Sequence, residues 1–265
     1  MKSFLILLFS VSIVFSSEYY AKVNPYEVRD ISSNVSGEVT FIDEDMIGYK
    51  LSNKPYLKID SKLDYQELKF IKDKLEYLRA SVKINDEVLK NLQSSTQRKR
   101  DNYKRVESLK IKSQIEKDKE YHDMISSENS LLNTQKEIQN LKIQITDLKL
   151  RLAQLRRSVY YKNLKAEGFV LYELLVKPGQ VVNIATPLAK VADISKAKLI
   201  IYLNQSDVLS AKSKVIYIDS IKTPYKITRI STIADSKNIS KYMAQIIINA
   251  PAVFSKLVKI ELKDE

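Results

Sequence analysis

The sequence predicts an α+β protein in which a long pair of helices is inserted between the two halves of a small β domain. Three observations predict this fold class. No glycine lies between Gly48 and Gly168 and no proline between Pro55 and Pro178, so the whole stretch lacks helix breakers. Within that stretch, apolar residues recur every seven residues. On either side of it, the chain carries two pairs of glycines with the same internal spacing.

Composition excludes several classes of function. The chain has 44 Lys and Arg against 32 Asp and Glu, a formal net charge of +12, which attracts phosphates or anionic lipid without fixing a fold. It has no cysteine, so disulfides, thiolate metal sites and cysteine nucleophiles are excluded. The one histidine, His122, lies in the charged segment "EYHD" and is interpreted as solvated. The four methionines are scattered and there is no glycine-rich phosphate loop, so we predict no catalytic residue, no metal site and no cofactor.

The N-terminus "MKSFLILLFSVSIVFSSEYY" has the layout of a secretory signal peptide. A lysine precedes an apolar run from Phe4 to Phe15, and Val14 and Ser16 suit the −3 and −1 positions of a cleavage site. The run is short for a membrane span. We therefore expect residues 1–17 to be a signal peptide, with an uncleaved N-terminal anchor as the alternative. Export makes nucleic acid an unsuitable partner for the positive charge.

Heptad rows predict two long helices. In the first segment, one heptad row contains Leu68, Leu75, Val82, Leu89 and Tyr103 and is broken by Thr96, and a second row, three residues later, contains Ile71, Leu78, Leu92 and Val106. In the second segment, one row contains Met124, Leu131, Ile138, Ile145, Leu152 and Val159, and a second row contains Leu141, Leu148 and Leu155. Two such segments with a polar gap between them predict an antiparallel coiled-coil hairpin over residues 62–158. The rows weaken from Lys110 to Glu120, so the turn is expected near 110–117. The charges of this segment are interpreted as a solvated face, with a charged binding stripe as the alternative.

The glycine pairs predict an internal repeat. At one constant offset, Gly37 aligns with Gly168 and Gly48 with Gly179, and then Leu51 aligns with Val182 and Leu57 with Leu188. Each copy has the pattern of a short strand, a tight turn that needs glycine at positive φ, and a second strand, and all four glycines are interpreted as structural turn residues. One such unit cannot bury its apolar face alone, so the two copies are expected to pack against each other.

These segments resemble a known family. "VSGEV" at 35–39, "GYKLSNKPYLKID" at 48–60, "KAEGFV" at 165–170 and "KPGQVVNIATPLAKV" at 177–191 look like the two half-motifs of a biotinyl/lipoyl-like domain. With long helices between the halves, the arrangement resembles the periplasmic adaptor subunits, or membrane fusion proteins, of the HlyD/AcrA-like family. Lys54 and Pro55 depart from the pattern, since the family usually has a third glycine there.

The resemblance implies a domain plan. A split lipoyl-like β-sandwich would comprise 35–61 with 159–194, and a small β-barrel domain would comprise 18–34 with 195–265. The alternating segments "KLIIYLNQSDVLSAKSKVIYIDS" and "YKITRISTIADSKNISKYMAQIIINAP" agree with a barrel. The membrane-proximal fourth domain of many efflux adaptors is not expected in this chain.

The resemblance also implies a function without chemistry. Such a protein is periplasmic and links an inner-membrane transporter, of RND or ABC type, to a TolC-like outer-membrane channel, in a ring commonly of six copies. A carrier domain with a swinging lysine is disfavoured, because the hairpin replaces the turn that displays the lysine. The remaining alternative is an exported structural coiled-coil protein with no transporter partner.

The family's partner-binding motif at the hairpin tip, where present, is Arg-x3-Leu-x6-Ser. Here Arg105 and Leu109 match its first two positions, but Glu116 occupies the third and Ser113 lies three residues early. The resemblance therefore implies a channel-binding tip formed by Arg105, Leu109, Ser113 and Glu116, in which Ser113 takes the role of the displaced serine or the channel recognises a different tip.

Overall fold

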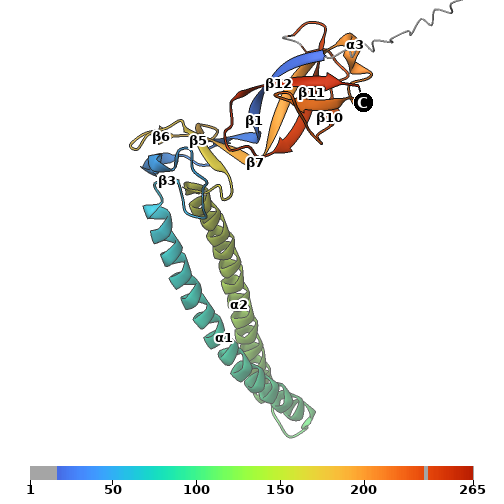
Figure 1. Cartoon of the computed structure of the whole chain (residues 1–265). Helices are drawn as coiled ribbons and strands as arrows, with labels where there is room; N and C mark the ends of the chain where they lie inside the picture. The colour runs from blue at the N-terminus through green and yellow to red at the C-terminus, as the bar shows by residue number, and fades with distance from the viewer. Residues whose placement is uncertain (1–16, 236–237, 265) are drawn as a thin grey trace, which may run out of the picture. The chain divides into compact units, whose positions relative to one another are not determined.

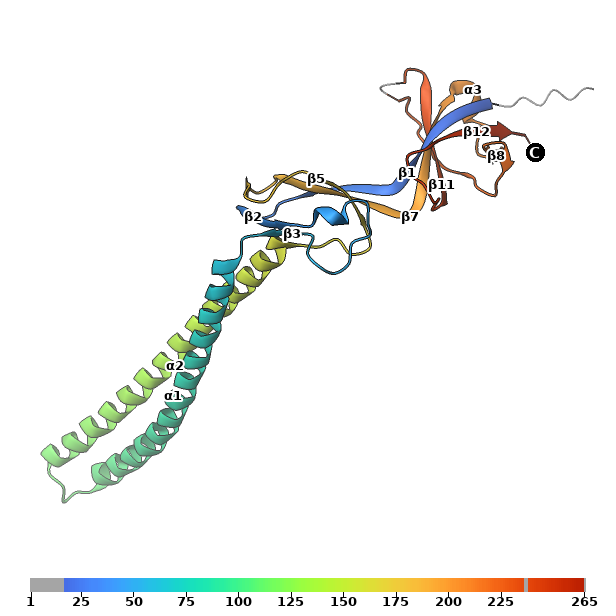
Figure 2. The same cartoon turned by 60° about the vertical axis from the view of Figure 1, so that its left-hand side comes forward.

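The computed structural model describes residues 17–235 and 238–264, so the expected signal peptide lies almost entirely outside the described residues. The chain forms two compact units. The helical unit comprises residues 59–163, and the β unit comprises the described residues of 1–58 and 164–265. Figures 1 and 2 show the long helices of the first unit and the sheets of the second.

The helical unit consists of two long helices, α1 (Lys62–Ser108) and α2 (Gln114–Lys162). They run side by side in both views (Figures 1 and 2). Two long helices in a mixed helix and strand protein are what the sequence predicts, and this part of the fold class is confirmed. α2 continues to Lys162, past the expected boundary at 158, because nothing in "VYYK" breaks a helix. One apolar cluster between the helices contains Leu68, Ile71, Leu75 and Leu155, with Ile145, Leu148, Leu152 and Val159 packed against it.

Side-chain contacts fix the antiparallel register of the two helices. Near the end where the chain enters and leaves the unit, Lys162 Nζ forms a salt bridge with Asp64. Further along, Arg151 Nε lies 2.7 Å from Glu67 Oε1. Thr96 then meets Ser127, with 2.8 Å between their hydroxyl oxygens. Residues 64–96 of α1 therefore lie alongside residues 127–162 of α2.

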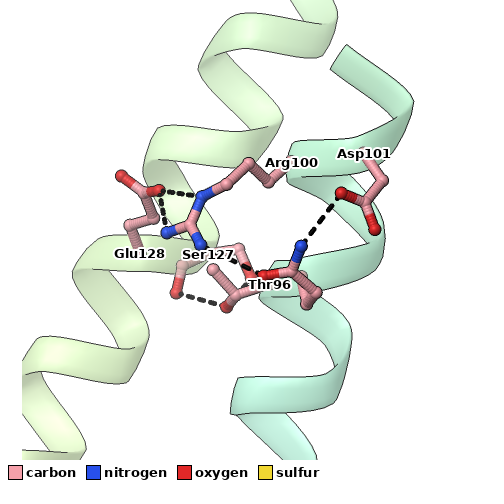
Figure 3. Close-up of polar contacts among 6 residues, drawn as sticks. Thr96, Arg100, Asp101, Ser127 and Glu128 are labelled. Carbon is pink, nitrogen blue, oxygen red and sulfur yellow. Dashed lines mark hydrogen bonds and ion pairs between the residues drawn. The ribbon is translucent and has the colours of Figure 1, made fainter. Parts of the chain in front are cut away.

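Thr96 and Ser127 form a polar layer inside the otherwise apolar contact between the helices. Both are buried, and they come from opposite helices (Figure 3). Beside them, Arg100 of α1 donates from Nη2 to Oε1 of Glu128 in α2 over 2.7 Å. Because a buried hydroxyl needs a partner, this contact favours the register that brings Thr96 opposite Ser127.

The β unit contains two sheets. The eight-stranded sheet has the order β10-β11-β7-β1-β12-β8-β9, and β5 also pairs with β7. Its strands are β1 (Ser17–Ser32), β5 (Val170–Leu174), β7 (Pro187–Asn204), β8 (Val215–Ile218), β9 (Ile221–Lys222), β10 (Ile227–Ile230), β11 (Lys241–Asn249) and β12 (Leu257–Lys263). The four-stranded sheet has the order β4-β3-β2-β6, with β2 (Gly37–Ile42), β3 (Leu57–Ile59), β4 (Asn163–Leu164) and β6 (Val181–Val182). Two short helices complete the unit, η1 (Glu44–Met46) and α3 (Gln205–Val208).

The long strand β1 changes partners along its length. Residues Ser17–Lys22 pair with β12, and from Val23 onward β1 pairs with β7. The register shifts between Pro25 and Glu27, where proline has no N–H to donate to a ladder. One strand thus takes part in two regions of the sheet.

The core of the larger sheet follows from alternation along the strands. In β7, Ala197, Leu199, Ile201 and Leu203 are fully buried while the residues between them are partly exposed. Side chains in a strand point to opposite faces in turn, so this period of two places one face of β7 in the core. Partners from the neighbouring strands include Val23, Ile246, Ile260 and Leu262.

The two glycine pairs join their copies reciprocally. The N–H of Gly48 donates to the carbonyl of Leu171 over 2.8 Å, and the N–H of Gly179 donates to the carbonyl of Val39 over 2.8 Å. Each copy's second glycine therefore binds the first strand of the other copy. The aligned residues Leu51 and Val182 are both buried. Through these two bonds, each half of the repeat supports the backbone of the other half.

Candidate partner-binding site

The four residues expected at the partner-binding tip lie at the connection between the long helices. Arg105 is in the last turn of α1, and Leu109 is the residue that ends this helix. Ser113 is the N-cap of α2, and Glu116 lies in its first turn. All four residues therefore lie at or beside the short connection of residues 109–113.

Ser113 and Glu116 are engaged with each other in a capping box. The Glu116 N–H donates to Ser113 Oγ over 3.3 Å, and the Ser113 N–H donates to Glu116 Oε2 over 3.0 Å. Lys112 Nζ adds a contact of 2.9 Å to Glu116 Oε1. The Lys112 side chain, together with the backbone and side chain of Ser113, lowers the pKa of Glu116 to about 2. These contacts satisfy backbone donors that are unpaired at a helix start, so the two residues stabilise the beginning of α2.

Arg105 is exposed and has only a local contact with its own helix. Its Nη2 donates to Asn102 Oδ1 over 3.4 Å. Asn102 in turn donates from Nδ2 to Glu120 Oε2 over 2.6 Å, which ties α1 to α2 beside the connection. The guanidinium group of Arg105 therefore retains most of its donors for another molecule.

Apolar side chains are exposed at the same connection. Ile111 is 90% exposed and Ile115 is 82% exposed, and Leu109 is also exposed. Sequence reasoning did not single out the two isoleucines. In "KIKSQIEKDKE", the two isoleucines are the only apolar residues among charged and polar ones, and the segment is too short to show a periodicity.

A groove beside the connection is lined by polar and aromatic side chains. Its volume is about 370 Å³, and Tyr103, Glu107, Gln114, Lys117, Asp118 and Tyr121 line it. The Tyr103 and Tyr121 rings lie with centroids 5.5 Å apart. Tyr103 Oη donates to Glu107 Oε1 over 3.0 Å, and this bond raises the pKa of Tyr103. His122 contacts the edge of Tyr121, with 5.8 Å between ring centroids.

The four glycines expected in turns divide into two groups. Gly48, Gly168 and Gly179 have φ values of 85°, 88° and 85°, in the left-handed region. Gly37 differs, because it has φ of 158° and opens strand β2, where it pairs with Val182. The expected turn at Gly37 is therefore a strand start, since pairing with β6 extends the backbone at this position.

The described part of the chain contains neither a cluster of metal-binding side chains nor a membrane-spanning helix. In residues 17–235 and 238–264, no group of three or more His, Cys, Asp or Glu side chains is arranged to hold a metal ion. In the same residues, no helix is both long enough and apolar enough to cross a membrane.

Solved structures share this fold. MacA from Actinobacillus actinomycetemcomitans aligns with 95% of this chain and 79% of its own, with a TM-score of 0.71 and 19% sequence identity. The membrane fusion protein Spr0693 from Streptococcus pneumoniae R6 aligns with 96% of this chain and 100% of its own, with a TM-score of 0.58 and 12% identity. A MacA–MexA chimera with the α-hairpin domain of Pseudomonas aeruginosa MexA aligns with 96% of this chain and 83% of its own, with a TM-score of 0.55 and 17% identity.

Sequence comparison alone finds no such likeness, since no family model and no curated protein matches the chain. At identities below one fifth, the structural likeness concerns the fold. At that level it confirms the resemblance to membrane fusion proteins as a likeness of fold. The chain therefore has the fold seen in MacA and in the membrane fusion protein Spr0693.

Proposed function

We propose that this protein is a periplasmic adaptor that links an inner-membrane transporter to a TolC-like outer-membrane channel. The observation that carries the proposal is the exposure of Leu109, Ile111 and Ile115 at the connection between two long helices. Exposed apolar side chains that stand together indicate a surface for another molecule. The fold shared with membrane fusion proteins supports the same role.

The proposal includes a finer domain plan. The reciprocal halves around Gly48 and Gly179 would form a lipoyl-like sandwich, and β1 with β7–β12 would form the small barrel. The long helices would pack as a coiled coil, and several copies would assemble into a ring. The adaptor would carry out no catalytic step and would lie in the periplasm after export.

Within the proposed site, the side chains have different roles. Ile111, Ile115 and Leu109 would supply apolar contact, and Arg105 would supply a charged hydrogen bond to a carboxylate or carbonyl of the channel. Ser113 and Glu116 would hold the connection in shape through the capping box. A partner that needed the Ser113 hydroxyl directly would have to break that box first.

Photo-cross-linking in intact cells tests the proposal. A photoreactive residue at position 111 is expected to capture an outer-membrane channel protein, because Ile111 is among the most exposed apolar side chains of the connection. The matched control carries the same group at Leu132, an exposed apolar position of α2 away from the connection. Capture of the channel at both positions, or at neither, contradicts the proposed site.

A second variant tests the charged contact. Arg105→Glu is expected to lower channel capture at position 111 about tenfold, because one lost charged contact at an interface corresponds to roughly 1.4 kcal/mol. Arg79→Glu, on the same helix but away from the connection, is the control. Unchanged capture with Arg105→Glu removes Arg105 from the site. If position 111 captures only copies of this protein, the chain is an exported structural coiled-coil protein instead.

A further inference from the structure

The three most exposed large apolar side chains in the described residues of the β unit lie in two connections between strands. Leu209 is 96% exposed, Ile239 is 86% exposed and Ile233 is 77% exposed. Leu209 directly follows the short helix α3, and the two isoleucines lie in the connection of residues 231–240 between β10 and β11. We name these three residues the loop triad. Single exposed apolar residues are ordinary on protein surfaces, so the meaning of the triad depends on whether its members lie together.

Strand pairing places the loop triad at one end of the larger sheet. The last residue of β7, Asn204, pairs with the first residue of β11, Lys241. Helix α3 follows β7 directly, and residues 231–240 immediately precede β11. Leu209 and the two isoleucines therefore leave the sheet at the same end, on two separate loops.

The first strand starts at this same end. Ser17 pairs with Leu262, close to the end of β12. Tyr19 Oη donates a hydrogen bond to Asp207 of α3, which holds the start of β1 against this helix. Both views show α3 beside the start of β1 (Figures 1 and 2). The chain therefore enters the β unit beside the loop triad.

The residues that precede β1 in the sequence are those expected to direct export. The apolar run from Phe4 to Phe15 predicts the signal peptide, and such a run enters the inner membrane when the chain is exported. Ser17 follows this run by two residues. Export would therefore bring the start of β1 to the periplasmic surface of the bilayer, whether the run is cleaved or stays as an anchor. The loop triad lies at that end of the β unit.

The form of the loop triad fits a bilayer better than a protein partner. A protein interface has a contiguous apolar core that packs as densely as a protein interior. The triad has no such core, because its side chains protrude singly from two loops. A bilayer interface is fluid and accepts apolar side chains without a matching shape.

Charged side chains near the triad are compatible with contact to lipid headgroups. Lys212 and Lys241 are exposed, and so is Asp264. Three further acidic side chains are held by protein partners: Glu18 by Lys259, Asp207 by Tyr19, and Asp235 by Asn238. The exposed lysines can approach the phosphate groups of phospholipids. Apolar insertion is nevertheless the main contribution, because the exposed charges partly cancel.

We propose that this end of the β unit rests on the phospholipid surface of the inner membrane and inserts Leu209, Ile233 and Ile239 into its interface. The contact is shallow, at the boundary between headgroups and acyl chains, and no segment of the described chain crosses the bilayer. It gives the β unit a defined end toward the membrane, in addition to any contact with a transporter. The inference rests on the proposed function, because a periplasmic adaptor bound to an inner-membrane transporter lies beside that bilayer.

A fluorescent label at single positions tests this contact, and the chain has no cysteine of its own. The full chain with Ile239→Cys is labelled with the environment-sensitive dye NBD, and vesicles of phosphatidylethanolamine and phosphatidylglycerol are added. We expect the NBD emission to shift to shorter wavelength and to be quenched by lipids with a doxyl group near the headgroup, because the label enters the interface. No shift at position 239 overturns the inference.

The matched control for the label is Val253→Cys. Val253 is 63% exposed and lies in the connection between β11 and β12. Because β11 begins at the triad end of the sheet, the connection that follows it lies at the other end. Its NBD emission is expected to stay unchanged when vesicles are added. An equal shift at positions 239 and 253 shows non-specific adsorption and overturns the inference.

Photo-cross-linking in cells identifies what contacts the triad. A photoreactive residue at position 209 is expected to capture phospholipid, detected as an increase in the mass of the chain that phospholipase reduces. The same group at position 253 is expected to capture none. Capture of a protein in place of phospholipid at position 209 shows that the loops bind a protein partner such as the transporter, and this result overturns the lipid contact.

A variant without the triad supplies a further test. It carries three changes, Leu209→Ser, Ile233→Ser and Ile239→Ser. NBD at Lys212→Cys is the reporter, because Lys212 is exposed and lies three residues after Leu209. The fraction of label in the interface is expected to fall at least about tenfold, since three apolar side chains no longer insert. Circular dichroism is expected to stay unchanged, since the three side chains face water in the single copy. Val253→Ser with Leu257→Ser is the control, and an equal loss in that control contradicts a contact through the triad.

The outcomes separate this inference from the proposed function. Channel capture at position 111 without the NBD shift at position 239 keeps the adaptor role and rejects the lipid contact. The NBD shift at position 239 and phospholipid capture at position 209, without channel capture, keep the lipid contact and reject the adaptor role.

Discussion

At the scale of single residues, Gly48 and Gly179 carry a conformational requirement. Both have φ of 85°, and an added Cβ would meet no atom within 4 Å at either position. The cost of a substitution there is therefore backbone strain rather than a clash with neighbours. Gly179→Ala is expected to lower the free energy of unfolding of the β unit by about 1–2 kcal/mol. Gly179→Asn should cost less, because asparagine adopts left-handed backbone more readily.

Chemical unfolding of the full chain measures this difference. Because the chain has no tryptophan, tyrosine fluorescence or far-UV circular dichroism serves as the probe. Gly48→Ala serves as the matched variant, since the two glycines have the same φ and make equivalent bonds to the opposite copy. Equal stability of the alanine and asparagine variants would show that the strain argument is wrong.

Glu116 gives the connection a dependence on pH. Its pKa is about 2, below its ordinary value of 4.5, so the folded form favours the charged carboxylate. A group with a lowered folded pKa contributes stability that is complete above its ordinary pKa and is lost as the pH falls through the folded pKa. The start of α2 is therefore expected to open increasingly as the pH falls from about 4.5 to about 2, as measured by hydrogen exchange of the amides at 115–117. Glu116→Gln, which can keep the capping geometry without titrating, should remove this dependence.

Ser113 shows what the sequence did and did not reveal at this scale. Its position near the turn was predictable, and the resemblance to a tip motif predicted a partner contact for its hydroxyl. The sequence Ser113-x-x-Glu116 also fits a capping box, a local pattern with a known geometry. The structure shows the capping geometry, and the partner contact of Ser113 remains a prediction.

At the scale of elements, the buried pair Thr96–Ser127 is a polar contact that helps to define the register of the two helices. Thr96→Val leaves the Ser127 hydroxyl buried without its partner and is expected to destabilise the helical unit by about 1–2 kcal/mol. Thr96→Val combined with Ser127→Ala removes both hydroxyls and should be close to neutral. A double-mutant cycle in urea unfolding measures the coupling, and Ser130→Ala, at an exposed serine of α2, is the control. Additive effects of the two single changes would show that the hydroxyls do not interact.

The neighbouring Arg100–Glu128 pair should matter less. The two side chains are 41% and 28% exposed, and water screens such pairs. Its removal is expected to change the free energy of unfolding by no more than about 1 kcal/mol. Of these two polar contacts, the hydroxyl pair is therefore expected to contribute more to the register than the ion pair.

The long helices could be predicted because their cause is local and periodic. The absence of Gly and Pro and the rows through Leu68 and Ile138 are visible in the sequence. Thr96 was visible only as an interruption of its row, since its partner Ser127 belongs to the other helix. A polar layer depends on which residues meet across the contact, and that is known only after the register is known. The exposure of Phe70 and Tyr77 on α1 was likewise not predicted, because burial cannot be read from a period alone.

At the scale of the whole molecule, the existence of strands was easier to predict than their partners. The alternation in β7 is visible in "KLIIYLN", and the reciprocal bonds of Gly48 and Gly179 agree with an internal repeat. The change of partner in β1, from β12 to β7, has no counterpart in the sequence except Pro25. Strand order is decided by pairing between distant segments, and a single sequence carries little information about that.

The pairing of β1 with β12 also determines the order in which the protein can be completed. Residues Ser17–Lys22 are synthesised long before residues 257–262, with which they pair. The helical unit is contiguous in the chain and can form before that. A chain cut short before Leu257 would thus have finished helices and an open sheet edge along β1. Such an edge invites aggregation and attack by proteases, so cellular quality control can distinguish complete from incomplete copies before they enter an assembly.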